Sequence, residues 1–545
     1  MDLIILFSIY FVLVFSIIGY GKLVCAHTKS KFDTGFEGLL GILLLIVLSY
    51  ASNFFIPHGY YHNSLIILFG FFYFIYLVFL KKIIFKDFKI IFLVFSILFI
   101  GLLMYKNHDD FITYHFPYTL SLINYKKIIG LGHITSGFTT PSSIFYLNSL
   151  FYLPFIEYYL TNSGAVYIMG FSNLFLLNIL KLNYKKKNFI LYLSSFSFVF
   201  INTVFYRIAE HGTDRSALIL VFLLSIIFLE SINIKKRISK DILFEYYVKL
   251  IVLISLIVSL KSFYLIYTLF FLFWTLYFKD DLFKKEVVFN YLNNRFFYLC
   301  SLGFTLFIFT VFLNTGCLIF PASFTCFESV QWSINLDTVK AFKLWFEQWS
   351  KAGAAPNFRV ENVEIYLSGI NWVEGWFERY FFTKVTDFLF VTLLITSIFY
   401  FLFSFKKKIK VHKNKIKYKL FYLIIFLLCL EWFLNHPALR YGGYTILALL
   451  IFIPMSIYLS NYNDLSTKIS RKLKFIITIS LIIFVSKNII RINSETLKYG
   501  YEVINKPYFH LDKSAFRTDI QIKEILKQNN NLSSKGYLII KKINN

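Results

Sequence analysis

The sequence lacks the motifs of several large enzyme and transporter classes. It contains no G-x-x-x-x-G-K-[ST], no H-E-x-x-H and no C-x-x-C, which are the patterns for nucleotide phosphate binding, catalytic zinc and dithiol redox chemistry. ATP-driven transport, zinc proteolysis and thioredoxin-like chemistry therefore have no support. No apolar segment carries the row of ionisable residues expected of a proton-coupled transporter.

Charge is also scarce, and most of it is positive. Only 16% of the 545 residues are charged and 57% are hydrophobic, whereas soluble domains have about 25% charged residues. The net charge of +26 would favour nucleic acid in a soluble protein. In an apolar chain, basic residues instead flank membrane helices and contact anionic lipid. We therefore expect membrane lipids, and no nucleic acid, as partners.

The chain has five cysteines, and three of them (Cys25, Cys300 and Cys429) lie in or beside apolar segments. The other two, Cys317 and Cys326, bracket a short loop that contains a proline. If this loop lies in an oxidising compartment, a disulfide between them is expected.

Lysine-rich loops alternate along the chain with loops that carry acids and histidines. The lysine-rich loops are 22–31, 81–89, 181–187, 235–240, 279–295, 406–419 and 468–474. By the positive-inside rule these loops face the cytoplasm and the loops between them face the exterior. We therefore expect a multi-pass protein of the bacterial inner membrane, with the acidic loops in the periplasm.

The fold class expected is an all-α membrane protein, a polytopic helical bundle of about 14 spans. The predicted spans are 2–19, 36–54, 64–80, 88–104, 164–180, 188–205, 216–232, 246–260, 262–278, 296–313, 385–404, 420–435, 443–460 and 474–488. The first is expected to be a retained helix and not a cleaved signal peptide.

The domain organisation follows from these spans. A membrane domain over 1–313 includes the acidic exterior loop 105–142 and an interfacial helix 143–160, because counting the latter as a span would put the lysines of 181–187 on the wrong side. An exterior tryptophan-rich loop 314–384, a second membrane part 385–488 and a small, mixed exterior tail 489–545 follow.

The first exterior loop holds the strongest candidates for chemistry. Asp109 and Asp110 are adjacent, are preceded by His108 and are followed by Tyr114 and His115. Two adjacent carboxylates at a membrane surface are costly unless they form ion pairs, are hydrated or bind a cation. A carboxylate among apolar rings has a raised pKa suited to a general base. The alternative is an ordinary solvated loop start; a divalent cation on Asp109 and Asp110 stays open.

A second cluster, Glu210, His211, Asp214 and Arg215, fills the turn between two predicted spans. An ion pair between Asp214 and Arg215, or Asp214 as a helix N-cap, is the alternative interpretation. The lysines alone define the faces, yet this cluster falls on the same face as the first. We therefore expect one shared substrate site.

Three further exterior residues complete the predicted set. Arg440 follows His436 just outside a span, and its guanidinium suits a phosphate or pyrophosphate. Lys261 is a lone cation at an apolar turn and a second candidate phosphate ligand. The alternatives are an interfacial anchor for Arg440 and a snorkelling side chain for Lys261.

The loop 314–384 contains five of the seven tryptophans: Trp332, Trp345, Trp349, Trp372 and Trp376. The one-turn spacing of Trp345–Trp349 and of Trp372–Trp376 favours amphipathic interfacial helices. The alternative is a set of aromatic faces that stack on sugars.

The acidic pair followed by Tyr-His-Phe-Pro-Tyr resembles the GT-C superfamily of integral-membrane glycosyltransferases. That resemblance implies helices in the exterior loops, a polyprenyl-phosphate sugar as donor, and a role for Asp109 or Asp110 as catalytic base or metal ligand. Residues 317–332, 353–361 and 436–444 are similar to a family of bacterial polytopic membrane proteins found in marine and surface-polysaccharide settings, to which no activity is assigned.

The function expected is transfer of a sugar from a lipid-phosphate donor to a glycan or lipid acceptor of the cell envelope on the exterior face. Alternatives are a polysaccharide polymerase or ligase acting on undecaprenyl-linked glycans, which would rely on arginine and histidine, and a lipid or oligosaccharide flippase. The flippase needs a polar path between the two faces, and few polar residues lie at mid-span.

Overall fold

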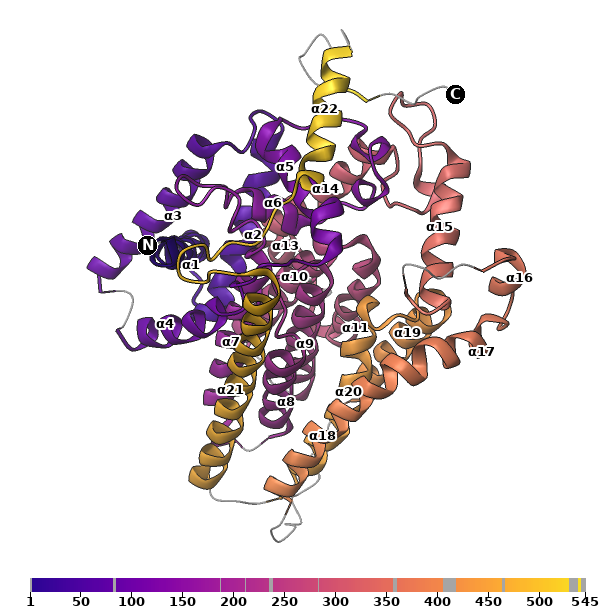
Figure 1. Ribbon diagram of the computed structural model, residues 1–545. Helices are drawn as coiled ribbons and strands as arrows, with labels where there is room; N and C mark the ends of the chain where they lie inside the picture. Colours follow the sequence, from indigo (N-terminus) through magenta and orange to yellow (C-terminus); the bar gives the residue numbers. More distant parts are fainter. Residues whose placement is uncertain are drawn as a thin grey trace.

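The computed structural model describes residues 2–81, 85–186, 188–210, 212–234, 239–282, 284–355, 360–404, 418–462, 466–528 and 538–540. Regular structure in these ranges is helical, and the only β-type contacts there are isolated bridges. The all-helical fold predicted from the sequence is therefore confirmed (Figure 1).

Nine helical stretches among the described residues are long and apolar enough to cross a membrane. They are α1 (Asp2–Thr28), α2 (Thr34–Asn53), α3 (Tyr60–Phe79), α7 (Gly164–Asn183), α9 (Gly212–Asn233), α10 (Lys240–Leu260), α14 (Arg295–Thr315), Trp372–Phe403 and Lys468–Tyr499. The protein is thus a multi-pass membrane protein by helix length and composition.

Five shorter helical segments fall on the remaining predicted spans. They are α4 (Phe85–Phe99), α8 (Phe189–Val204), η4 with α11 (Ser262–Tyr277), α19 (Lys419–Asn435) and α20 (Gly443–Leu459). The helix that ends with α18 (Thr386–Phe403) begins earlier than predicted, since α17 (Trp372–Trp376) and the π-helical η6 (Phe377–Val385) run directly into it.

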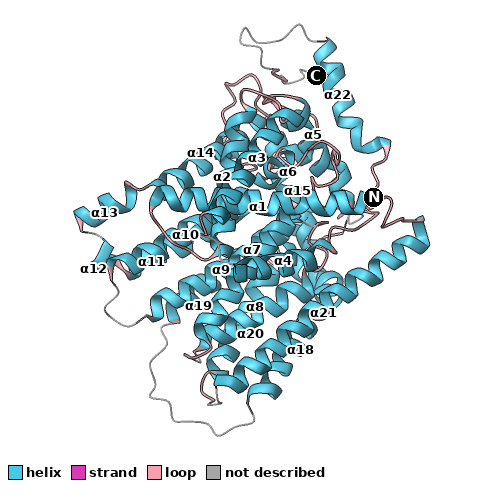
Figure 2. Ribbon diagram, turned by 90° about the vertical axis from the view of Figure 1, so that its left-hand side faces the viewer, coloured by secondary structure: helices cyan, strands magenta, loops and turns pink. Residues whose placement is uncertain are grey.

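The centre of the bundle is α9, which packs against α7, α8, α10 and α20. Its apolar window is 89% buried, whereas the windows of α3 and of α21 (Ser466–Tyr499) are each 28% buried. Helices that keep apolar side chains outward need a lipid environment, whereas a helix buried all round belongs in a core. Figure 2 shows α9 enclosed by its neighbours and α21 extending at the side.

The segment after α4 forms the predicted exterior acidic loop. It contains the π-helix η1 (Phe111–His115), α5 (Phe116–Asn124), two short 3-10 turns, η2 (Leu131–His133) and η3 (Ser136–Phe138), and then α6 (Ser143–Ser149). The predicted interfacial helix 143–160 is helical only over α6, and α6 is buried. Pro154 removes a backbone donor and disfavours helix before it, and Phe155 and Glu157 have φ of 71° and 44°.

Lys127 fastens this loop to the membrane helices. Its Nζ donates to Asn314 Oδ1 at 2.8 Å and to Tyr146 OH at 3.2 Å, and its backbone N–H donates to Asn53 O at 2.8 Å. The side chain is buried, and its hydrogen-bond partners in the described residues are neutral groups. Burial lowers the pKa of Lys127 to about 7.

This pKa makes stability depend on pH in a defined direction. Between about pH 7 and the ordinary lysine value of 10.5, the unfolded chain binds a proton that the folded chain does not, so stability rises with pH across this window. The free energy of unfolding should therefore rise by a few kcal/mol between those limits in the wild type, and this rise should be absent in Lys127→Met. The measurement is unfolding of detergent-purified protein from pH 7 to 10; identical pH slopes for both proteins would contradict the buried, neutral amine.

The C-terminal segment covers the acidic loop. His510 N–H donates to Tyr105 O at 2.7 Å, and the Phe509 ring lies 5.2 Å from that of Phe111. α22 (Arg517–Gln528) lies beside α5, drawn in yellow over violet in Figure 1. Within the described residues, the end of the tail forms a parallel bridge between Ile539 and Ile129.

Candidate functional site

Asp214 joins two cations from distant parts of the chain. Its carboxylate lies in the first turn of α9, where the helix dipole favours an acid. Lys261 Nζ, between α10 and η4, is 2.6 Å from Oδ1, and Arg440 Nε, in the 3-10 turn η7 (Leu439–Tyr441), is 2.7 Å from Oδ2. Asp214 is buried, so its single negative charge offsets part of the charge of both cations and fixes their orientation.

Asp110 extends this set toward solvent. Its Oδ2 lies 3.5 Å from Arg440 Nη2 and 3.5 Å from His108 Nδ1, and its own N–H donates to His108 Nδ1 at 3.1 Å. The Asp110 side chain is 31% exposed. We refer to Asp110, Asp214, Lys261 and Arg440 as the charge cluster; residues from the two predicted acidic loops meet the two predicted phosphate ligands there.

Aromatic rings line the charge cluster. The Arg440 guanidinium carbon is 5.5 Å from the Trp349 ring centroid and 5.6 Å from that of Tyr441, and Lys261 Nζ is 4.5 Å above Tyr441. Cation–π contacts of this kind favour a cation in a partly dry site. Trp349 belongs to α15 (Leu336–Lys351), so the tryptophan-rich loop reaches the cluster.

Other tryptophans hold the turn that carries Arg440. Trp376 Nε1 donates to Pro437 O at 2.9 Å, Trp432 Nε1 donates to Ala438 O at 2.8 Å, and Leu439 N–H donates to Tyr380 OH at 2.8 Å. Trp372 and Trp376 are buried. Both lie in the helix α17, as their spacing predicts, but they pack inside the protein and do not form an interfacial belt.

His115 is buried behind the charge cluster. Its Nε2 has no hydrogen-bond partner in the described part of the chain, and a cavity of about 10 Å³ lies between it, Asn148, Asn162 and Thr213. That volume holds about one water. Burial lowers the pKa of His115 to about 4, although Asp110 and Asp214 act in the opposite direction. The imidazole is therefore neutral at ordinary pH.

Tyr114 is also next to the charge cluster. Its ring contacts His115 edge-on, with centroids 4.4 Å apart. Burial, and after it the nearby Asp110 carboxylate, raise the pKa of the Tyr114 phenol. The phenol therefore keeps its proton and can act as a neutral hydrogen-bond donor.

Several predicted site residues lie apart from the charge cluster. Asp109 is 85% exposed and is 3.5 Å from Lys106. Glu210 pairs with Arg207 and Arg491, and Arg215 Nη1 donates to Arg207 O at 3.2 Å. Glu210 and Asp110 therefore belong to different groups of ion pairs and do not share the charge cluster.

Of the two remaining predicted histidines, His436 and His211, only His436 lies in the described residues. The His436 ring packs at 5.2 Å from Phe263 and 5.8 Å from Tyr441, beside the cluster. His211 lies outside the described residues.

No group of three or more His, Cys, Asp or Glu side chains in the described part of the chain is placed to hold a metal ion. The suggested cation role of Asp109 and Asp110 therefore gains no further ligand from these ranges. Cys317 and Cys326 are joined by a disulfide, the pairing expected from the sequence.

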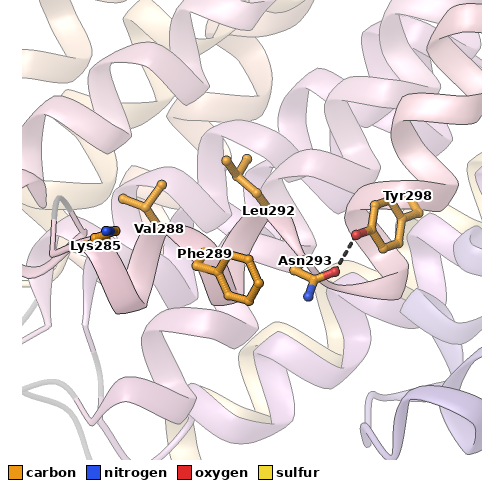
Figure 3. Close-up of a pocket in the computed structure, with 6 residues that line it drawn as sticks. All are labelled: Lys285, Val288, Phe289, Leu292, Asn293 and Tyr298. Atoms are coloured by element: carbon orange, nitrogen blue, oxygen red, sulfur yellow. Dashed lines mark hydrogen bonds between the residues drawn. The ribbon is translucent and has the colours of Figure 1, made fainter.

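A second, larger hollow lies elsewhere. It has a volume of about 580 Å³ and is lined by Lys285, Val288, Phe289, Leu292, Asn293 and Tyr298, on α13 (Lys285–Leu292) and around the start of α14. Figure 3 shows these side chains, with the Tyr298 hydroxyl bonded to Asn293. Five of the six lining residues belong to the predicted cytoplasmic loop 279–295, Tyr298 lies in the next predicted span, and the lining contains no acid, so this hollow is not the candidate site.

Most of the chain, including the charge cluster, matches a known protein family. A family model described as Domain of unknown function (DUF8201) matches residues 1–447. The chain belongs to the DUF8201 family. All four residues of the charge cluster and the disulfide lie inside the matched range, whereas α21 and α22 follow it. No curated protein and no solved structure matches this DUF8201 protein.

Proposed function

We propose that this DUF8201 protein is an integral-membrane glycosyltransferase of GT-C type. It moves a sugar from a lipid-phosphate donor to a cell-envelope acceptor on the exterior face of the bacterial inner membrane. The observation that carries the proposal is the charge cluster, in which a partly exposed carboxylate lies beside two anchored cations at the ends of membrane helices.

The cations are suited to the donor phosphate. Arg440 uses Nε for Asp214, its contact to Asp110 at 3.5 Å is long for a charge-assisted bond, and Nη1 has no hydrogen-bond partner among the described residues. The forked end of the guanidinium is therefore available for two phosphate oxygens. Lys261 adds a second positive charge, held in place by the same Asp214.

Asp110 is suited to act as the base. In an inverting displacement, the acceptor oxygen forms a bond to the anomeric carbon and its proton passes to the carboxylate. The bond from that carbon to the phosphate oxygen breaks, and the lipid phosphate leaves with the electron pair. Arg440 and Lys261 stabilise the charge that develops on the phosphate, so departure needs little acid assistance.

Further observations support sugar chemistry. Trp349 and Tyr441 place aromatic faces next to the cations, where a sugar bonded to the phosphate would lie. The acidic loop resembles that of GT-C enzymes, and the disulfide supports an oxidising exterior for the same face.

The experiment is transfer in proteoliposomes. The purified chain is supplied with polyprenyl-phosphate hexoses and an envelope glycan acceptor, and released polyprenyl phosphate and glycosylated product are measured. Release of both in equal amounts supports the proposal. Joining of whole undecaprenyl-linked glycans, or movement of lipid-linked sugar across the bilayer without bond cleavage, would replace it by the polymerase or flippase alternative.

Arg440→Lys should lower this transfer by about 10²-fold, because a single ammonium group cannot donate the forked pair of hydrogen bonds to phosphate. The comparison is with Lys506→Gln, an exposed cation of the tail, which should keep wild-type activity. Activity of Arg440→Lys equal to wild type would exclude Arg440 from phosphate binding.

A further inference from the structure

A second concentration of cations lies where the turn between α8 and α9 meets α21. Its positive members are Arg207, Arg215, Lys487 and Arg491, and its carboxylates are Glu210 and Glu495. We call the four cations the basic cluster. They exceed the carboxylates by two charges; Lys487 is exposed and Arg207 is 42% exposed, whereas Arg491 is only 10% exposed, so part of the excess lies where an uncompensated charge is costly.

The carboxylate of Glu210 is already fully engaged. It is 0% exposed; Arg207 Nε donates to Oε1 at 2.7 Å and Arg207 Nη2 to Oε2, while Arg491 Nη1 donates to Oε1 at 3.1 Å. Glu495 Oε2 accepts from the backbone N–H of Tyr105 at 2.7 Å. The two carboxylates are therefore occupied and leave the surplus charge unbalanced.

Hydrogen-bond donors remain open in the basic cluster. The Arg491 side chain is only 10% exposed; its Nη2 donates to Leu103 O at 2.8 Å, and its Nε has no hydrogen-bond partner among the described residues. The Arg207 side chain is 42% exposed. Lys487 Nζ donates to Thr203 O at 3.1 Å and lies 4.7 Å above the Tyr206 ring. A buried guanidinium N–H without an acceptor costs free energy that an anionic oxygen would recover.

The cluster borders the lipid-facing surface of α21. Lys487 and Arg491 are one helical turn apart, so they lie on the same side of the helix. The exposed apolar side chains Ile482, Ile489 and Ile490 belong to the same stretch. A polar headgroup whose acyl chains run along α21 would bring its phosphate to these cations.

We propose that the basic cluster binds the phosphate of an anionic lipid from the leaflet on the Asp110 side. Arg207, which is 42% exposed, and Lys487 supply donors to the phosphate oxygens at the lipid boundary. Arg491, held by Glu210 and Leu103 O, adds positive charge behind them. Basic pockets between membrane helices bind anionic headgroups in this way. The site does not depend on sugar transfer, because it shares no residue with the charge cluster.

Binding to the full-length, detergent-purified chain tests the proposal. The probes are dioctanoyl phosphatidylglycerol, its zwitterionic phosphatidylcholine counterpart and inorganic phosphate, measured by native mass spectrometry and titration. We expect preference for the anionic lipid. Lys487→Gln should weaken it about 5-fold and Lys487→Gln with Arg491→Gln about 25-fold, the effect of about 1 kcal/mol for each cation near an anionic headgroup.

Two comparisons keep the outcome decisive. Lys498→Gln with Lys506→Gln removes the same charge from exposed positions and should bind as wild type does, and Arg491→Lys should recover part of the loss. Equal binding of both lipids, or wild-type binding by the Lys487 and Arg491 variants, overturns the proposal. Inorganic phosphate that binds as tightly as the lipid overturns the lipid as the ligand.

Discussion

Asp110→Asn is expected to lower sugar transfer by about 10²- to 10⁴-fold, the usual contribution of a positioned general base. Asparagine keeps the size of the side chain but cannot accept the acceptor's proton. The carboxylate touches Arg440 and His108 at 3.5 Å and is partly exposed, so folding and insertion should change little. Transfer in proteoliposomes and the melting temperature of the same preparation measure the two effects separately.

Asp109→Asn is the matched control. Asp109 is the neighbouring carboxylate, but it is 85% exposed and pairs with Lys106 outside the charge cluster. We expect its variant to retain transfer close to wild type. Equal losses in both variants would indicate that the loop needs acidic charge in general, and full activity of Asp110→Asn would exclude Asp110 as the base.

Much of the membrane architecture was predictable because its signals are local. Apolar stretches of spanning length and lysine-rich loops are visible in the sequence alone, and each predicted span overlaps a helix. Segment 143–160, predicted as an interfacial helix, is helical only over Ser143–Ser149, because an apolar composition fits a helix and a buried irregular chain equally well. Pro154 was the one residue there that signals the end of a helix.

The charge cluster was only partly predictable, since its contacts join residues far apart in the sequence. The lysine-defined faces brought Asp110, Asp214, Lys261 and Arg440 to the same side. The same reasoning could not separate Asp110 from Asp109, because adjacent residues of a turn point in different directions. It also could not separate Glu210 from Asp214.

The unforeseen partners arise from tertiary packing. Arg491 lies in a segment predicted to be an exterior tail, yet α21 continues through it and brings the guanidinium to Glu210. Trp349 has a helical spacing that fits an interfacial helix equally well, and only its contact with Arg440 distinguishes a site residue. No periodicity in a single sequence encodes such pairings.

Asp214→Ala is expected to destabilise the folded protein by about 3–5 kcal/mol, the cost of leaving buried charges unpaired. Asp214 is the buried carboxylate between Lys261 Nζ at 2.6 Å and Arg440 Nε at 2.7 Å. Without it, two cations face each other in a partly desolvated site, and among the described residues the remaining counter-charge is Asp110, 3.5 Å from Arg440 Nη2. Denaturation of the detergent-purified chain measures the loss.

A second substitution distinguishes charge from packing as the cause. Adding Lys261→Met to Asp214→Ala removes one of the stranded cations, so the double variant should recover part of the stability, a coupling expected of groups in direct contact. Asp109→Ala, an exposed carboxylate in the nearby loop, should change stability by less than about 0.5 kcal/mol. If Asp214→Ala behaves like Asp109→Ala, the cations have another counter-charge and Asp214 does not organise the phosphate site; a double variant no more stable than the single one would attribute the loss to packing.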